Sequence, residues 1–402
     1  MTTDCDILIS GGGPAGAALA LALADGRRRI VVVEPRAEPP TGDARATALA
    51  EGSIRLLDAL GAWAPLAPDS VAVRRVEVSQ RGHFGRTRID AAEEGVTALG
   101  RVVAYDALAR VLAGLARAAP GVEWLAPRAV ADARGEPEAM AVRIEHPDGG
   151  AAEERRARLV VAADGTDSPL RRALAIDTRV HDYGQTALLV ALEAGGDPHT
   201  AHERFTDEGP LALLPAGGRR RTLIWTVAPE RADELLALSP ADFAAAVEGR
   251  LGRGQAPVRM LGTPARFPLR RVEAQYASGY RACLVGNAAR TLHPVAAQGF
   301  NLALRDVCGL AAALAEVDDP GDESAREAWL ERREADQWRT RAFTDLLAER
   351  FAERGAAPGA VRAGALLGLD LCPAGRHALA AQNMGLADGL PRVGRWRLGP
   401  RP

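Results

Sequence analysis

The first 34 residues show a change of hydrophobic period that predicts a strand, a helix and a second strand. Residues 6–10 alternate and then run apolar, as a buried parallel strand does. An Ala- and Leu-rich segment from Pro14 to about Asp25 predicts a helix that Gly26 ends. The run IVVVE, which closes on Glu34, predicts the second strand. This order indicates the βαβ start of a Rossmann-like α/β fold.

Two later segments repeat the step from strand to helix. The apolar run Leu159–Ala163 stops at Asp164-Gly165, and a helix with Pro169 at its first position follows. The run ACLVG precedes a loop that Pro294 stiffens and a helix that starts near Gln298. Each segment, taken alone, is equally consistent with an ordinary connection and with a nucleotide contact.

The intervening region has a different pattern. Residues 176–269 contain three strand-like runs, LLVALEA, GPLALLPA and RTLIWTVA, and one helical run over 239–251. Residues 322–355 carry charges and aromatic residues at helical spacing, which predicts a long helix packed on the body of the protein. We therefore expect a sheet domain and a helical carboxyl-terminal region beside the Rossmann-like part.

The first turn carries candidate chemistry. Gly11, Gly13 and Gly16 form a G-x-G-x-x-G motif between the predicted strand and helix. In such a motif the glycines allow a tight turn, a close approach to a pyrophosphate and close helix packing, and the helix N-terminus attracts phosphate. Glu34, 18 residues after Gly16, is placed to accept hydrogen bonds from ribose hydroxyls. The motif indicates a dinucleotide but does not choose between NAD and FAD.

Composition narrows the class of protein. The net charge of −2 and pI near 6.4 give no basic face, so nucleic acid is not an expected partner. The four cysteines have no metal-ligand spacing, and we predict no metal site. No apolar run reaches the roughly 18 residues that span a bilayer. We expect a cytoplasmic protein that at most lies on the inner face of a membrane.

The three nucleotide-type segments, in this order, resemble the FAD-dependent aromatic hydroxylases of the p-hydroxybenzoate hydroxylase type. Residues 43–63, DARATALAEGSIRLLDALGAW, resemble the ubiquinone-biosynthesis branch of that family, as do GNAARTLHP, QGFNL, YGQTAL and the tail GALLGLDLCPAGRHALAAQNMGL. Within the branch the likeness is greatest to the octaprenyl-methoxyphenol hydroxylases. Ala297 and Ala303 stand where relatives have glycine, and Asn287 replaces a carboxylate.

This resemblance implies one FAD held by all three segments, with Arg45 and Arg101 against the flavin and the backbone near Val130 against the adenine. The predicted FAD-binding residues are Gly11, Gly13, Pro14, Ala15, Gly16, Glu34, Arg45, Arg101, Val130, Asp164, Gly286, Asn287, Gln298, Gly299, Phe300 and Asn301. No second G-x-G-x-x-G motif follows a strand, so NAD(P)H would dock transiently over the flavin.

Catalytic and substrate residues are less distinctive. We assign His293 and Pro294 to catalysis because a histidine titrates in the range of a proton shuttle, with a structural histidine as the alternative. Tyr183, Arg204 and Trp225 are predicted to line the substrate pocket, with packing or surface roles as the alternative.

The reaction that the resemblance implies is hydroxylation of the ring of a prenylated phenol by NAD(P)H and O2, through a flavin C4a-hydroperoxide. The alternatives are a phenol hydroxylase of specialised metabolism, an FAD-dependent reductase of prenyl double bonds, and a non-catalytic flavoprotein of a biosynthetic assembly. A prenyl tail also implies peripheral membrane contact, for which AGALLGLDL and Trp396 are the candidate segments.

The predicted fold is an α/β FAD-binding domain of the GR2 type, interleaved with a β-sheet substrate domain and followed by helices. We assign residues 1–75, 97–175 and 270–325 to the FAD-binding domain. Residues 76–96 and 176–269 form the predicted substrate domain, and residues 326–402 form the helical region.

Overall fold

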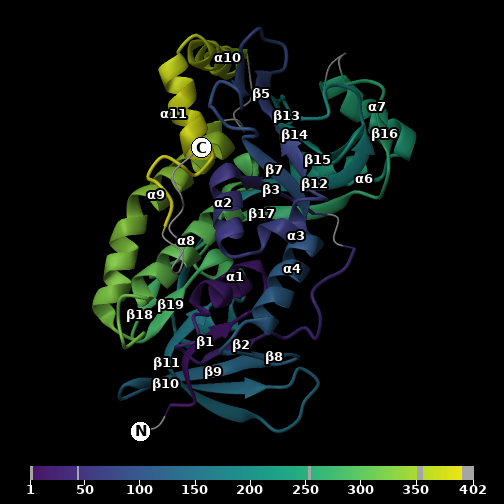
Figure 1. The fold of residues 1–402 in the computed structure, drawn as a ribbon. Helices are drawn as coiled ribbons and strands as arrows, with labels where there is room; N and C mark the ends of the chain where they lie inside the picture. The colour runs from purple at the N-terminus through teal and green to yellow at the C-terminus, as the bar shows by residue number, and fades with distance from the viewer. Residues whose placement is uncertain (1–2, 43–44, 252–254, 351–355, 392–402) are drawn as a thin grey trace.

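The computed structural model describes residues 3–42, 45–251, 255–350 and 356–391. Two large sheets lie at opposite ends of the molecule, with a small sheet between them and the last helices along one side (Figure 1). The small sheet contains β3 (Ala46–Ala50), β7 (Gly100–Ala104) and β4 (Val71–Val73), and α2 (Glu51–Ala59) and α3 (Trp63–Leu66) lie beside it.

The first sheet is the Rossmann-like layer. Its central order is β18 (Ser278–Gly279), β19 (Ala282–Leu284), β11 (Glu153–Ala162), β1 (Cys5–Ser10), β2 (Ile30–Val33) and β8 (Val122–Leu125). The five strands from β19 to β8 in this order pair in parallel. The antiparallel strands β9 (Ala129–Glu136) and β10 (Ala139–Glu145) extend from β11.

Alternate residues of β1 fill two cores. Ile7 and Ile9 are fully buried against α1 (Pro14–Leu23), α4 (Tyr105–Ala118) and α8 (Gln298–Leu314) on one face. Leu8 points to the other face, where Val160 and Val142 surround it. Burial on both faces explains why these strands read as continuous apolar runs rather than alternating ones.

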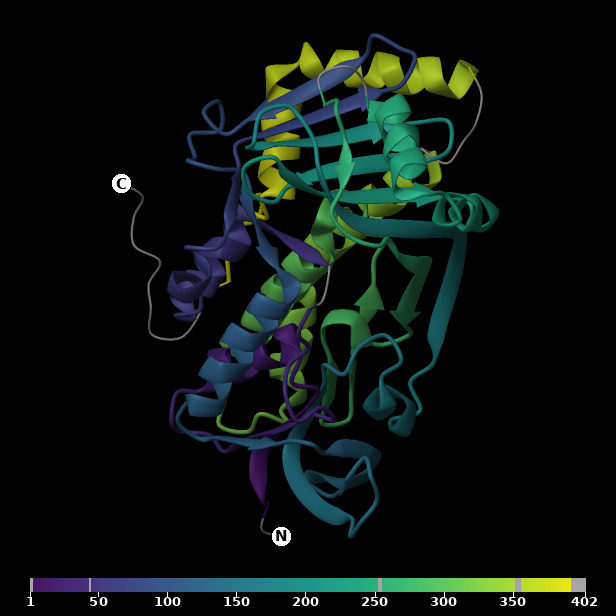
Figure 2. The same cartoon turned by 90° about the vertical axis from the view of Figure 1, so that its right-hand side faces the viewer.

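The second sheet runs β20 (Arg290–Thr291), β17 (Ala265–Ala274), β12 (Thr178–Glu193), β15 (Arg220–Val227), β14 (Pro210–Pro215), β13 (Thr200–Phe205), β5 (Arg75–Gln80) and β6 (Arg86–Asp90), with β16 (Arg259–Met260) beside β12. Helices α6 (Pro229–Leu236) and α7 (Pro240–Leu251) cover one face, where Phe243 and Val247 pack on Leu223 and Trp225. The other face is turned toward α10 (Ala356–Asp370) and α11 (Pro373–Asn383), which lie over the end of the molecule (Figure 2).

The long helix α9 (Glu323–Arg350) is attached to α8 by a buried charge network. Arg305 is 1% exposed and its Nε donates to Asp336 Oδ2 at 2.7 Å, while Arg333 Nε donates to Asp306 Oδ1 at 2.9 Å. Burial would raise the pKa of Asp336, but the hydrogen bond from Arg305 and the charge of Arg333 outweigh it and hold that pKa below its usual value. The network fixes the helical region to the helix that starts at the loop described below.

The strands and helices predicted from the hydrophobic pattern are present. The first helix ends at Leu23, two residues before the predicted end, and α9 covers residues 323–350 of the predicted 322–355. Residues 351–355 of that prediction lie outside the described part of the chain. The domain boundaries stay a prediction, although β17 belongs to the second sheet as far as residue 274. Among the described helices, none is long and apolar enough to cross a membrane.

Candidate cofactor and substrate site

The glycine motif forms the turn between β1 and α1. Gly11 has φ of +99°, and a Cβ there would lie 2.6 Å from the carbonyl oxygen of Ala163. A Cβ on Gly16 would lie 1.9 Å from the carbonyl oxygen of Gly11, so this residue permits the close approach of helix and turn. Gly13 is the N-cap of α1, carries no side-chain cap, and a Cβ there would meet no atom within 4 Å. The helix N-terminus therefore faces open space with free N–H groups, as an anion site requires.

Glu34 lies at the end of β2, beside this turn. Its Oε2 accepts a hydrogen bond from the backbone N–H of Gly12 at 2.7 Å, and its Oε1 accepts one from Arg36 at 3.0 Å. The connection before β9 reaches the same point, because Arg128 N–H donates to the carbonyl of Glu34 at 2.8 Å. Val130, two residues further on, is buried within β9. This geometry is consistent with the predicted ribose and adenine contacts.

The second and third predicted segments meet the first. Asp164 Oδ2 accepts hydrogen bonds from Ser10 Oγ at 2.9 Å and from Leu170 N–H at 3.0 Å. Gly286 lies against Ala15, since a Cβ on Gly286 would be 3.1 Å from the Cβ of Ala15. Asp164 Oδ1 is buried and has no hydrogen-bond partner among the described residues. A polar atom left in this way beside a helix N-terminus fits a ligand with hydroxyl or phosphate groups.

Arg171 joins the second segment to the third. Its Nη1 donates to the carbonyl of Ala288 at 2.9 Å and its Nη2 donates to the carbonyl of Thr166 at 2.8 Å. Asn287, between Gly286 and Ala288, is exposed. The structure thus leaves the predicted ligand side chain of Asn287 accessible while its neighbours are held in place.

A rigid loop follows, from His293 to Gln298. The Val295 backbone N–H donates to His293 Nδ1 at 3.2 Å, so the proton of the neutral ring is on Nε2, which lies 3.0 Å from Gln185 Oε1. Burial lowers the pKa of His293 to about 4, and the ring is therefore neutral at pH 7. With both nitrogens engaged, the arrangement favours the structural alternative for His293 over a proton shuttle.

The loop ends in two left-handed residues. Ala296 and Ala297 have φ of 62° and 50°, and Ala297 is the N-cap of α8 without a side-chain cap. The methyl group at each position strains the backbone, as the resemblance predicted for Ala297. Gln298 Nε2 donates to the carbonyl of Asn383 at 3.2 Å, and the side-chain carbonyl oxygens of both residues are buried without partners among the described residues.

Asn301 has a structural position in α8. Its Oδ1 accepts from Ala50 N–H at 2.8 Å, and its Nδ2 donates to the carbonyls of Ala48 and Ala297 at 2.9 and 2.7 Å. These three bonds occupy the amide and tie the loop to β3. Phe300 packs against the first core, and a Cβ on Gly299 would meet no atom within 4 Å. Asn301 is thus placed to shape the site rather than to offer a free amide to a cofactor.

The two predicted arginines belong to the small sheet and its approach: Arg101 is in β7, and Arg45 directly precedes β3. The Arg45 guanidinium stacks 4.1 Å from the ring centroid of Tyr105. Arg101 Nε donates to Ser70 Oγ at 2.8 Å, and its guanidinium lies 5.8 Å from the ring centroid of Trp63. Arg101 also lines the cavity described next, whereas Arg45 is exposed.

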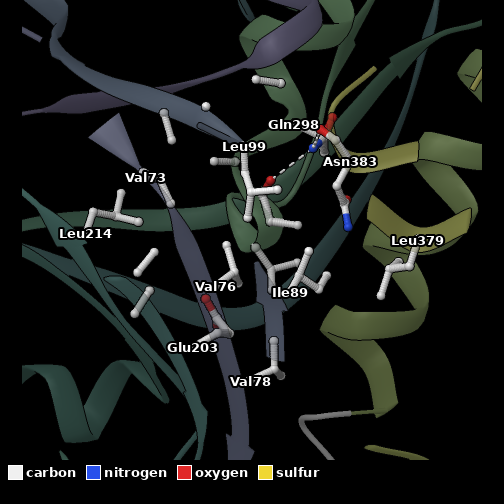
Figure 3. Close-up of a pocket in the computed structure, with 18 of the residues that line it drawn as sticks. Val73, Val76, Val78, Ile89, Leu99, Glu203, Leu214, Gln298, Leu379 and Asn383 are labelled. Atoms are coloured by element: carbon white, nitrogen blue, oxygen red, sulfur yellow. Dashed lines mark hydrogen bonds between the residues drawn. The ribbon is translucent and has the colours of Figure 1, made fainter. Parts of the chain in front are cut away.

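An apolar cavity of about 300 Å³ lies between the small sheet, the second sheet and the last helices (Figure 3). One wall of the cavity is formed by the loop described above, through its residues 294–298. Aliphatic side chains of the second sheet and of α9, α10 and α11 line most of the remainder: Val76, Val78, Ile89, Ala212, Leu214, Ile224, Leu347, Leu366, Leu369 and Leu379. Such a site suits a hydrophobic ligand with few polar groups.

None of the three predicted substrate residues is among the described residues that line this cavity, and their role in binding a substrate stays a prediction. Trp225 is fully buried on the opposite face of the sheet, and Arg204 points to that same face because it pairs with Leu211 next to Trp225. Tyr183 packs against the loop. Its ring meets the His293 ring edge-on, with the two ring centroids 4.9 Å apart, and its hydroxyl donates to Asp345 Oδ1 at 2.8 Å.

Sequence reasoning also missed four residues that the structure places at the site: Ser10, Gln185, Glu203 and Asn383. Glu203 and Ile224 are the immediate neighbours of Arg204 and Trp225. The bulk of Trp225 was the available signal, because a large aromatic residue on a strand followed by two helices belongs under those helices. That assignment would have placed the adjoining residues on the cavity side.

Residues of three separated segments thus meet beside the N-terminus of α1, an arrangement that defines a dinucleotide-binding protein with a Rossmann-like layer. The comparisons agree. The family described as FAD binding domain matches residues 4–344, and the chain belongs to it. Within this family it falls in the branch of ubiquinone-biosynthesis hydroxylases, and FAD is its cofactor.

Two relatives support that placement. Ubiquinone hydroxylase UbiL of Rhodospirillum rubrum is 33% identical over 86% of this chain and 81% of its own. The 3-demethoxyubiquinol 3-hydroxylase of Escherichia coli is 33% identical over 81% of this chain and 82% of its own. The fold matches p-nitrophenol 4-monooxygenase PnpA from Pseudomonas putida with a TM-score of 0.80 at 18% identity, covering 98% of this chain and 100% of that one. The predicted fold class and family resemblance are confirmed.

The open space before Gly13 gives a first prediction. We expect Gly13→Ala to fold normally, because its φ is −64° and a Cβ meets no protein atom, but to lose FAD because the methyl group enters the phosphate site. Bound FAD per protein after gel filtration should fall about tenfold or more, the effect of losing about 1.4 kcal/mol. Gly114→Ala, in α4 and equally open, is the matched control. Full FAD content in Gly13→Ala would contradict this placement of the pyrophosphate.

The left-handed alanines give a second prediction. Ala297→Gly should stabilise the protein by about 1 kcal/mol, because glycine adopts positive φ without strain, and should raise the melting temperature. The same change at Ala303, in the interior of α8, should cost about 1 kcal/mol and serves as the control. A lower melting temperature for Ala297→Gly would show that the alanine methyl group contributes more by packing than it costs in backbone strain.

Proposed function

We propose that this protein is an FAD-dependent, NAD(P)H-consuming monooxygenase that hydroxylates the ring of a prenylated phenol in ubiquinone biosynthesis. The observation that supports it is the apolar cavity, whose wall is the same loop that begins α8 at the cofactor site. Its volume of about 300 Å³ is at the lower end for ligand pockets, enough for a ring and the start of a tail. The names of the two relatives point to the same class of substrate.

When bound, FAD would accept a hydride from NAD(P)H and activate O2, which is the chemistry that the protein itself lacks. The chain would orient the ring and exclude water. The N-terminus of α8 would stabilise negative charge next to the cavity through the free backbone N–H groups that follow Ala297. The neutral His293 would hold the loop in place by its bonds to Val295 and Gln185.

Product mass tests this function. Aerobic incubation of the holoenzyme with NAD(P)H and a short-chain prenylphenol should give a product with one added oxygen atom. A reduced product with unchanged oxygen count would favour a prenyl reductase instead. Bound FAD with no NAD(P)H oxidation stimulated by any of a panel of phenols would favour the non-catalytic alternative.

We also propose that α10 docks on the inner face of a membrane. The inner side chain Leu366 of this helix lines the cavity, while Val361, Leu367 and Leu371 are 73%, 48% and 74% exposed. Phe84, on the hairpin that packs against α10, is fully exposed. A long prenyl tail exceeds the cavity and would leave it beside these residues. Trp396, the other predicted membrane contact, lies outside the described residues.

Co-sedimentation with vesicles of phosphatidylcholine and phosphatidylglycerol tests this contact. The double variant Phe84→Ser, Leu371→Ser should bind about a hundredfold less than wild type or weaker, because each apolar side chain contributes roughly 1.5–3 kcal/mol when buried. Tyr276→Ser removes an exposed aromatic residue beside the first sheet and should bind as wild type does. Equal sedimentation of all three proteins, or none by wild type, would remove the proposal.

A further inference from the structure

Glu203 lies on the cavity wall in an apolar setting. It belongs to β13, between β14 and β5, and its strand partners Ala212 and Val78 also line the cavity. The side chain points in among Val76, Val78 and Ile89, and Gln298 and Asn383 lie across the same space (Figure 3). A carboxyl group in such a place is expensive to ionise unless something binds it.

No described protein group binds it. Arg101, His202 and Glu203 are the ionisable side chains among the described lining residues. Arg101 is engaged by Ser70 at 2.8 Å, and the His202 ring lies 3.7 Å from Glu77 and 3.5 Å from Gln255. No hydrogen bond or ion pair joins the Glu203 carboxyl to another described residue. Carboxyl groups in apolar surroundings are normally paired, so this half-buried one, which faces a cavity without a partner among the described residues, is placed for a ligand.

Burial is the cause of its altered acidity. It raises the pKa of Glu203 to about 7, with no charged neighbour contributing. The group therefore ionises at higher pH than an ordinary carboxyl group and becomes a full acceptor as pH rises through about 7. Its protonation state responds to what enters the cavity.

We propose that Glu203 is a substrate-binding residue that accepts a hydrogen bond from the ring hydroxyl of a neutral phenol and rejects rings that carry a carboxylate. The inference rests on the proposed function for the choice of a phenol. A phenol O–H is a strong donor, and a hydrogen bond to a carboxylate in an apolar site is among the stronger kinds. A ring carboxylate would bring a second negative charge next to Glu203, and the one arginine among the described lining residues, Arg101, is held at the small sheet by Ser70 and is not paired with Glu203. The cavity would thus select for phenols that have already lost any ring carboxyl group.

Ligand binding to the holoenzyme tests this directly. The probes are 2-prenylphenol and 3-prenyl-4-hydroxybenzoate, titrated without NAD(P)H and followed by the change in flavin absorbance. Wild type should bind the phenol at least about tenfold more tightly than the benzoate, and its affinity for the phenol should rise with pH through about 7. Glu203→Gln should bind the phenol about tenfold more weakly with a flat pH profile, and should narrow the gap between the two probes.

Glu77→Gln is the matched control, since Glu77 is on the adjoining strand β5, is not among the described lining residues and has its carboxylate 3.3 Å from Arg88. It should leave both affinities unchanged. Thermal unfolding checks the environment of Glu203 separately. Because folding raises the pKa of this carboxyl group, the wild-type protein loses stability as pH rises from about 4.5 through 7. The glutamine variant has no such group, so the difference in melting temperature between Glu203→Gln and wild type should be more in favour of the variant at pH 8 than at pH 5.

Unchanged phenol affinity and pH profile in Glu203→Gln would overturn the proposal. Equal binding of the two probes by wild type would do the same. These outcomes are independent of turnover: a wild-type enzyme that binds the phenol through Glu203 but adds no oxygen would overturn the proposed reaction and leave the role of Glu203 standing.

Discussion

The hydrogen bond between Ser10 and Asp164 joins the carboxyl ends of two neighbouring parallel strands, and the cofactor site depends on that junction. Parallel pairing brings the ends of β1, β11 and β19 to one edge of the sheet, where each strand gives way to a turn. Because the pairing is fixed by a core that is buried on both faces, the turns have little freedom to move. Three sequence segments become one binding surface for this reason.

The same junction positions the apolar cavity. The segment after β19 continues into the loop from His293 to Gln298, and residues 294–298 of that loop line the cavity. His293 and Asn301 fasten the loop at its two ends to the second sheet and to the small sheet. Strain at Ala296 and Ala297 is retained because these attachments over-determine the loop.

The sequence was most informative where a local steric rule decides the structure. The glycine motif predicted its turn because a side chain at Gly11 or Gly16 would overlap backbone atoms. The residues that line the cavity were harder to predict, because which side of the sheet becomes the cavity depends on the elements that pack on each face. Successive residues of a strand point to opposite faces, so Arg204 and Trp225 each lie one position away from a residue that lines the cavity, Glu203 and Ile224. The hydrophobic pattern likewise could not predict that α10 and α11 line the cavity, because the place where a helix packs depends on contacts with residues far away in the sequence.

The cavity wall is completed by segments very far apart along the chain, and this has a consequence for synthesis from the amino terminus. The pairing of β5 with β13 and the bond from Thr87 to Leu366, 279 residues away, can form only after the intervening chain has emerged. The nucleotide-type segments are complete at the start of α8, whereas the cavity wall also needs α10 and α11. In a growing chain the nucleotide-type segments are therefore complete before the helices that close the cavity. During that interval the aliphatic face of the second sheet is open to water. It is the surface of the nascent protein on which a chaperone would act.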